Sequence, residues 1–406
     1  MFNLHLDAEQ IEFRDTVRSF AANEIRPVAI HPDRLEPFAK PLMMDLLGQA
    51  SELGLRVLTL SEAAGGVGAD TLTSCIVLEE MAAGDVDIAV TLGETDLLGH
   101  LLFDNWMTPD QSERFLKRFT EDPAFHLGHG GSTPEVSGWN YHEDLPNETG
   151  AGVSAVMQDG DWVIDGSVSL AANAPIADLM VVPVRSDWAG GMSALVVPRD
   201  PPGLTIAETG EQTQVRWHHG SAANIQFRSC KVPSENLLGE AGNSPLSGGE
   251  YDALHTLQRA AINLGVGQAA FDAAVAYAKI RRQGGRNIVE HQAIGKFIAG
   301  MAVKLEAART MIWKAAWVAD HPEAIADRSV SDLPQQIIAS IFTAETVLEV
   351  TQTAAECFGA MAVMRDMPLQ KYVEDANMFV HSNGNDVSTS LQIAEAVVGY
   401  ERTPAA

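Results

Sequence analysis

Residues 52–82 read ELGLRVLTLSEAAGGVGADTLTSCIVLEEMA, in which two apolar segments flank a glycine-rich break. The break contains three glycines that mark a tight connection, Gly65, Gly66 and Gly68. Apolar residues recur at helical spacing after the break, and the same spacing begins near Asp7. No strand pattern interrupts it, so residues 1–122 are predicted to form a helical domain.

The residue pattern of the chain changes after this domain. Short β-rich runs, each bounded by Gly, Pro, Asp or Asn, occur in residues 123–240. They are DWVIDGSVSL (161–170), DLMVVPVRS (178–186), SALVVPRD (193–200), TIAETG (205–210) and AANIQFRSCKVP (222–233). Their spacing predicts a central antiparallel β-barrel or sandwich domain.

Residues 241–406 return to a helical pattern, with long, amphipathic, alanine-rich segments. These segments span residues 256–282, 289–319 and 333–359. Helices of this length usually pack in a bundle, and their surplus apolar faces often bury against other subunits. The sequence therefore predicts an α+β fold, with a helical domain, a β domain and a four-helix-bundle-type domain in that order.

Composition and charge exclude several classes of protein. The chain has 406 residues, of which 46% are hydrophobic, and a net charge of -27. It lacks an apolar run of roughly 18 residues and a signal-peptide pattern, so we expect a cytoplasmic protein without membrane insertion. The negative charge disfavours a nucleic-acid partner, because phosphate binding needs basic patches. The scattered cysteines have no metal-ligand spacing, so no metal site is predicted.

Four stretches together resemble the acyl-CoA dehydrogenase family, in the order that the family shows. They are residues 52–82, DGDWVIDG (159–166), RRQGGRNIVEHQAIGKFIAGMAVKLEAARTMIWKAAW (281–317) and YVEDANMFVHSNGND (372–386). The resemblance implies a flavoprotein with FAD at a subunit interface, as a homo-oligomer or as a heterotetramer with a related subunit. It also implies an acyl-CoA substrate, lipid or side-chain catabolism, and electron-transfer flavoprotein or another acceptor as redox partner. In the family, a glutamate takes the α-proton of the thioester while the β-hydride passes to the flavin.

Several positions match functional residues of the family. Arg281 matches the arginine that reaches the FAD pyrophosphate of a neighbouring subunit, a role that suits a guanidinium. Gln292 matches a further FAD contact, and Gly359 matches the first glycine of a turn near the adenosine. Arg259 matches an arginine near the acyl-CoA pocket, and Glu94 lies on the helix that corresponds to one wall of that pocket.

Other cofactor positions depart from the family pattern. The flavin-contacting Trp-Ile-Thr becomes Leu-Ala-Ala, ending at Ala172, and a retained Asn173 follows. Ser132 stands for the threonine of the family's Thr-Glu-Pro loop. The phenylalanine after the pyrophosphate arginine becomes Gly284, and Glu356 replaces a glutamine before the glycine-rich turn. An acidic side chain beside an anionic cofactor is unfavourable, so the way in which FAD is held stays open.

The position of the family's catalytic glutamate holds an amide. Counted along the YVEDA stretch, this position is Asn383, followed by Gly384 of the substrate site and by Asn385 in place of a flavin-contacting threonine. Some members carry the base on a helix instead, at the position that is Gln258 here. An amide cannot accept a proton as a base, so neither position holds one.

Three interpretations remain open. In the first, the base has moved, with His381 and Asp386 as candidates near the usual position and with Glu94 and Asp96 on the pocket wall. In the second, flavin and acyl-CoA serve an elimination or an oxygen-dependent oxidation, and the amide orients the thioester. In the third, the chain is a non-catalytic or half-site subunit that pairs with a related chain holding the glutamate. Large-to-small changes, Gly284 among them, also suggest a pocket wide enough for a bulky acyl group.

Overall fold

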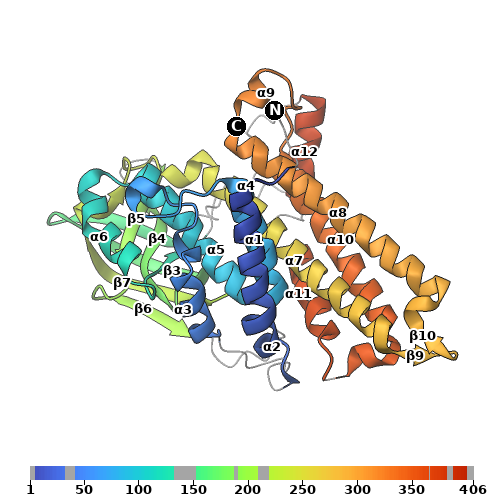
Figure 1. Ribbon diagram of the computed structural model, residues 1–406. Helices are drawn as coiled ribbons and strands as arrows, with labels where there is room; N and C mark the ends of the chain where they lie inside the picture. The colour runs from blue at the N-terminus through green and yellow to red at the C-terminus, as the bar shows by residue number, and fades with distance from the viewer. Residues whose placement is uncertain are drawn as a thin grey trace.

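The computed structural model describes residues 5–32, 42–131, 152–186, 191–208, 219–364, 366–381 and 387–399. Helices come first along the chain, a sheet follows, and long helices end it (Figure 1). This order confirms the α+β fold class that the sequence predicts. No helix within those residues is long and apolar enough to cross a membrane.

The amino-terminal part is helical, and its two central helices are covered on all sides. Its elements are α1 (Ala8–Phe20), a π-helical turn (Ala21–Ile25), α2 (Arg26–Ala29), α3 (Met44–Glu52), α4 (Thr71–Gly84), α5 (Val86–His100), a second π-helical turn (Leu101–Trp106) and α6 (Pro109–Glu121). Nearly every side chain of α4 and α5 is buried. Asp85 separates these two helices and caps α5 by accepting hydrogen bonds from the backbone N–H groups of Asp87 and Ile88.

The glycine-rich break between α3 and α4 is a compact loop with two 3-10 turns, Leu55–Val57 and Glu62–Ala64. A β-carbon at Gly66 would lie 2.2 Å from the Leu60 carbonyl oxygen. Any side chain at this position would clash with the backbone, so the loop requires glycine here. Asp96 of α5 fixes the same loop by accepting hydrogen bonds from the N–H (2.8 Å) and the hydroxyl (3.0 Å) of Thr59. The break therefore needs glycine for close packing as well as for turning.

The central part is a mixed eight-stranded sheet. Its strands are β1 (His126–His129), β2 (Val153–Gln158), β3 (Asp161–Ala172), β4 (Ala177–Ser186), β5 (Gly191–Pro198), β6 (Leu204–Glu208), β7 (Ala222–Pro233) and β8 (Leu237–Leu238). They lie in the order β6-β7-β3-β1-β4-β5-β8, with β2 beside β3 and β4. Because β1 inserts between two strands of opposite direction, it is antiparallel to β3 and parallel to β4. The sheet is thus mixed rather than purely antiparallel.

The carboxyl-terminal part is a bundle of long helices. Its elements are α7 (Glu250–Ile280), β9 (Arg282–Gln283), β10 (Arg286–Asn287), α8 (Gln292–Asp320), α9 (Glu323–Ala326), α10 (Gln335–Phe358), a 3-10 turn (Gly359–Val363), α11 (Leu369–His381) and α12 (Val387–Val398). Strands β9 and β10 form a hairpin whose turn residues, Gly284 and Gly285, have φ values of 61° and 83°. A positive φ suits glycine, so the phenylalanine of the family pattern would be strained at Gly284.

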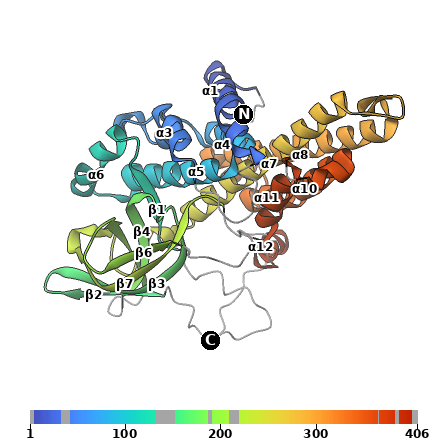
Figure 2. The same cartoon turned by 90° about the horizontal axis from the view of Figure 1, so that it is seen from below.

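Helix α7 lies at the centre of the helical packing. It packs against α4 and α5 as well as against α8, α10 and α11. At its crossing with α4, a β-carbon at Gly265 would lie 2.2 Å from the Glu79 carbonyl oxygen, so glycine permits the close approach. Figure 2 shows the sheet and the arm formed by α8 and α10 on opposite sides of α4 and α7.

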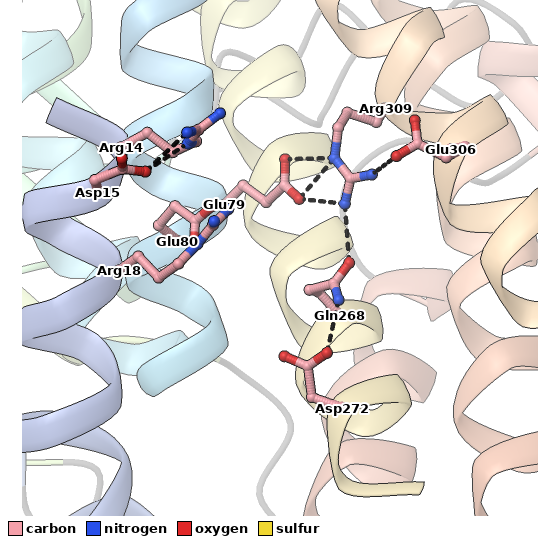
Figure 3. A network of polar contacts seen from close by, with 9 residues as sticks. All are labelled: Arg14, Asp15, Arg18, Glu79, Glu80, Gln268, Asp272, Glu306 and Arg309. Atoms are coloured by element: carbon pink, nitrogen blue, oxygen red, sulfur yellow. Dashed lines mark hydrogen bonds and ion pairs between the residues drawn. The ribbon is translucent and has the colours of Figure 1, made fainter. Parts of the chain in front are cut away.

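A group of polar side chains joins α4, α7 and α8 (Figure 3). Arg309 of α8 donates to the Glu79 carboxylate through Nε (3.0 Å) and Nη2 (2.7 Å), and Nη2 also donates to Gln268 of α7 (2.9 Å). On the α1 side of α4, Glu80 pairs with Arg18. We call Glu79, Gln268 and Arg309 the junction cluster, because they hold the two helical parts together.

Candidate functional site

The first turns of α7 carry a stripe of polar and aromatic side chains on one face. Tyr251, His255 and Arg259 follow one another at intervals of four residues, which places them on the same side of the helix. Tyr251 and Arg259 are buried, and His255 is half-buried. Buried polar side chains in a helix that is otherwise rich in alanine indicate a site rather than a packing face.

Glu94 of α5 faces this stripe. The Tyr251 hydroxyl donates a hydrogen bond of 2.8 Å to Glu94 Oε1, and His255 Nε2 lies 3.6 Å from Oε2. Burial raises the pKa of Glu94 to about 7, although the Tyr251 hydrogen bond and the charge of Arg259 oppose the rise. Burial also lowers the pKa of His255 to about 3, helped by the charge of Arg259, so its imidazole is neutral at neutral pH.

The sheet contributes His129, the last residue of β1, to the same group. Its ring stacks on Tyr251 with a centroid separation of 4.6 Å, and Tyr251 also stacks on His255 at 5.3 Å. His129 is buried, which lowers its pKa to about 4. Its Nε2 has no hydrogen-bond partner among the residues that the structure describes. We call Glu94, His129, Tyr251, His255 and Arg259 the pocket cluster.

Arg259 connects the pocket cluster to α11. Its guanidinium lies 4.6 Å from the centroid of the Phe379 ring, and Nη2 lies 3.4 Å from His219 Nδ1. Burial lowers the pKa of Arg259 to about 10, so the group stays charged at neutral pH. His219 stacks on Phe379 at 4.3 Å, and its Nε2 lies 3.8 Å from Asp375 Oδ1. This places a positive charge at α11, the helix that precedes Asn383.

Gln258, next to Arg259, occupies one of the two positions where the family places its base. Its Nε2 donates to Ser74 Oγ of α4 at 3.4 Å, and the side chain is buried beside Gly93 of α5. The structure therefore shows a buried amide, not a carboxylate, at this position. The other position, Asn383, lies outside the described residues, as do Ser132, Gly384, Asn385 and Asp386.

The remaining candidates for a moved base lie in different surroundings. His381 is the exposed last residue of α11. Asp96 is buried, and both of its oxygens accept hydrogen bonds from Thr59, so it serves the loop before α4. Glu94 is thus the one candidate among His381, Asp96 and Glu94 that the structure brings together with Arg259.

Asn173, which the resemblance assigns to the cofactor, is used inside the chain. Its side-chain nitrogen donates to the Thr91 carbonyl (2.9 Å), the Leu127 carbonyl (3.1 Å) and the Thr95 hydroxyl (3.3 Å). These bonds fasten α5 to β1. The preceding Ala172 is the half-buried end of β3.

The other cofactor positions lie together at the far end of the bundle. Arg281 follows α7 and is exposed, and Gln292 begins α8. Glu356 is exposed in the last turn of α10, and Gly359 follows it with a φ of 58°. Tyr277 and Phe358 stack at 4.1 Å and so join the ends of α7 and α10. Figure 1 places this end, marked by β9 and β10, opposite the sheet that carries Ala172.

Among the described residues, no group of three or more His, Cys, Asp and Glu side chains is placed to hold a metal ion. The cysteines Cys75, Cys230 and Cys357 are buried and free.

Comparison with known proteins places the chain in a family. The family model described as "Acyl-CoA dehydrogenase, N-terminal domain" matches residues 7–122, and "Acyl-CoA dehydrogenase, C-terminal domain" matches residues 255–398. The probable acyl-CoA dehydrogenase YngJ of Bacillus subtilis is 30% identical, over 98% of this chain and 100% of its own length. The mitochondrial short-chain specific acyl-CoA dehydrogenase of Mus musculus is 29% identical, over 94% of this chain and 88% of its own. These matches define a flavoenzyme class of oxidoreductase. The chain belongs to the acyl-CoA dehydrogenase family.

Solved structures show the same fold. Butyryl-CoA dehydrogenase from Megasphaera elsdenii superposes with a TM-score of 0.79 at 24% identity, covering 98% of this chain and 99% of that chain. A glutaryl-CoA dehydrogenase from Mycobacterium smegmatis in complex with FADH2 gives a TM-score of 0.77 at 18% identity, covering 97% and 96%.

Sequence reasoning named Glu94, Gln258 and Arg259, and the structure brings these three into one region. It missed His129, Tyr251 and His255. The stripe of polar residues at four-residue intervals in α7 was a usable signal, whereas the stacking of β1 on that stripe depends on contacts across the fold.

Proposed function

We propose that the chain is a subunit of an FAD-dependent oxidoreductase that acts on the CH–CH group of an acyl-CoA thioester. The subunit works in a homo-oligomer or in a heterotetramer with a related subunit. The separation of the two sets of cofactor positions carries this proposal: Ala172 lies at the sheet, and Arg281 lies at the tip beyond α7 (Figure 1). A cofactor that contacts both sets has to lie between two chains.

Exposed apolar side chains support such an assembly. On α8, Val303 is 70% exposed and Phe297 is 39% exposed, and Ile280 at the end of α7 is 76% exposed. A second chain that packs against the bundle would remove these side chains from water.

The chain's own residues provide binding and orientation. Bound FAD would supply the acceptor for the β-hydride of the substrate. Arg259 provides a buried positive charge that Phe379 and His219 hold in place. Gln258 can donate or accept a hydrogen bond but cannot take the α-proton.

A second candidate function is a half-site subunit, in which a related partner chain provides the glutamate. The amide at Gln258, buried and bonded to Ser74, favours this alternative, because its surroundings are adapted to a neutral side chain. In this case Arg281 and Gln292 serve a cofactor held mainly by the partner. Electron-transfer flavoprotein or another acceptor would take the electrons from the assembled enzyme.

A bulky acyl group is a further part of the proposal, supported by the small Ala172 at the end of β3, which pairs with His129 of β1. Ala171 does not contribute, because its side chain is buried in the core of the sheet. Gly284 does not contribute to this argument within one chain. It forms the β9–β10 turn at the end of the bundle opposite the sheet (Figure 1).

The visible absorption spectrum of the purified protein tests the proposal first. We expect flavin bands in the chain alone or after co-expression with a related subunit that has the glutamate. Arg281→Gln should lower the bound flavin at least tenfold, because a guanidinium suits a pyrophosphate. Arg282→Gln is the matched control, since Arg282 is an exposed neighbour that bonds to the Gly285 carbonyl of its own turn.

Two outcomes separate the candidates. Flavin in the isolated chain, with reduction by an added saturated acyl-CoA, would support a catalytic subunit. Flavin that appears only in the mixed assembly would support the half-site subunit. A protein that takes up no FAD in either preparation would overturn the proposed function.

A further inference from the structure

We propose that the pocket cluster binds a hydroxyl group at the distal part of the acyl chain, so that the substrate is a hydroxylated acyl thioester. This inference rests on the proposed function, because it names the substrate class of the same site. It starts from buried polar atoms of the cluster whose hydrogen-bonding capacity the described residues leave unused.

Polar atoms on two elements, α5 and β1, have spare hydrogen-bonding capacity. Glu94 Oε2 has His255 Nε2 at 3.6 Å, which is longer than a hydrogen bond. His129 Nε2 and Thr91 Oγ1 are buried and have no partner among the described residues. Thr91 lies one turn before Glu94 on α5, and His129 stacks on Tyr251, which is bonded to Glu94. Unsatisfied buried polar groups are rare in proteins and call for a ligand, a water molecule or another explanation.

The composition of the cluster differs from that of an acyl pocket for a hydrocarbon chain. A purely apolar acyl end would leave His129 Nε2, Thr91 Oγ1 and Glu94 Oε2 against methylene groups, without hydrogen-bond partners among the described residues. His129 and Glu94 come from different elements, β1 and α5, and both meet Tyr251 of α7. A polar group on the ligand would satisfy atoms that the chain itself leaves without partners.

The charges favour a neutral hydroxyl over an ammonium or a carboxylate. The buried guanidinium of Arg259 lies one helical turn from His255 on the same face of α7 and would repel a ligand ammonium. A ligand carboxylate would meet the acidic Glu94 instead. A hydroxyl both donates and accepts, and it therefore matches a carboxyl group that is half protonated near neutral pH and a neutral imidazole.

Titration calorimetry of the purified oligomer with matched pairs of acyl-CoAs tests the inference without relying on activity. The pairs are butyryl-CoA and 4-hydroxybutyryl-CoA, hexanoyl-CoA and 6-hydroxyhexanoyl-CoA, and octanoyl-CoA and 8-hydroxyoctanoyl-CoA. We expect the hydroxylated member of at least one pair to bind about tenfold more tightly, as one buried hydrogen-bonded hydroxyl allows. The corresponding ω-amino compounds should bind less tightly than the hydroxyl compounds.

Variants assign the preference to the cluster. Thr91→Val and Glu94→Leu should each lower the ratio of the two affinities to about one or below. Glu306→Gln serves as the control, since Glu306 is an exposed residue of α8 outside the site. If Glu94→Leu does not fold, Thr91→Val alone decides, because it removes a buried hydroxyl that has no partner among the described residues and keeps the shape of the side chain.

The outcomes separate this inference from the proposed function. Equal binding within every pair, or tighter binding of the methyl-ended or ω-amino compounds, would overturn the hydroxyl preference while leaving the acyl-CoA site in place. Failure to bind any acyl-CoA, with flavin bound or after co-expression with a related subunit, would overturn both.

Discussion

Two polar clusters lie along α7. Each contains a buried glutamate, but the partners of the two carboxyl groups differ. In the junction cluster, Glu79 faces the guanidinium of Arg309 with Nη2–Oε1 and Nε–Oε1 distances of 2.7 Å and 3.0 Å (Figure 3). In the pocket cluster, Glu94 faces the hydroxyl of Tyr251 and the neutral imidazole of His255. The first glutamate has a charged partner in direct contact, and the second is surrounded by groups that suit a protonated carboxyl as well as an ionised one.

The difference indicates two uses of buried charge. Burial raises the pKa of Glu79, but the bidentate contact with Arg309 opposes it and raises the pKa of Arg309, so we take this pair as ionised at neutral pH. Within the described part of the chain no such contact stabilises the charge of Glu94, whose pKa rises to about 7. A cluster built for stability pairs its charges, whereas a cluster that leaves a carboxyl near its titration point is adapted to a ligand or to proton transfer.

The largest expected effect comes from breaking the junction cluster. Arg309→Leu should lower the free energy of unfolding by about 3–5 kcal/mol, because it leaves Glu79 buried without its charged partner. Urea denaturation followed by circular dichroism measures the loss. Glu306→Gln, which removes the exposed partner of the same arginine, should change it by less than about 1 kcal/mol. Equal effects of the two substitutions would contradict the assignment of the cluster to stability.

Replacing the buried glutamate of the pocket cluster should raise the free energy of unfolding above neutral pH, not lower it. A carboxyl whose pKa rises on folding, here from 4.5 to about 7, contributes its full stability below the unfolded value and loses it as pH rises through the folded value. Glu94→Gln removes this loss. It should match the wild type at low pH and exceed its unfolding free energy by up to about 3 kcal/mol above pH 7. Denaturation at a series of pH values checks the crossing, and a variant that is less stable at every pH would refute it.

Much of the fold could be predicted because its signals are local. The strand pattern placed β7 at residues 222–233, the same bounds that the structure gives, and the long segments of the bundle match α8 and α10 to within a few residues. In the sheet, β1, β2 and β8 were missed. β1 is a four-residue strand, HLGH, in which two histidines and a glycine break any apolar alternation. Its assignment depends on its place between β3 and β4, which no local pattern encodes.

The candidate site could be predicted only in part for the same reason. Glu94, Gln258 and Arg259 were named from the resemblance, and the structure adds the contacts that define their roles. The role of Asn173 was not foreseen, since its bonds to Thr91, Thr95 and Leu127 depend on how α5 lies against β1. The resemblance assigns Arg281 to the FAD of a neighbouring subunit, but no local pattern encodes how far Arg281 lies from Ala172 within one chain. The assignments around Asn383 stay predictions.

The smallest expected effect is the coupling between Arg259 and its aromatic neighbour. Arg259 stacks on an aromatic ring, whereas Arg309 contacts a carboxylate. The Phe379 ring lies 4.6 Å from its guanidinium, and such contacts contribute about 1–2 kcal/mol when they are desolvated. A double-mutant cycle with Arg259→Met and Phe379→Leu, measured by urea denaturation, should give a coupling of about 1 kcal/mol. The cycle for Arg309→Leu and Glu79→Leu should give a larger coupling, because truncating one member of a buried ion pair leaves the other charge without its partner. If the Arg259 cycle gave the larger coupling, the assignment of the stronger pairing to the junction cluster would be wrong.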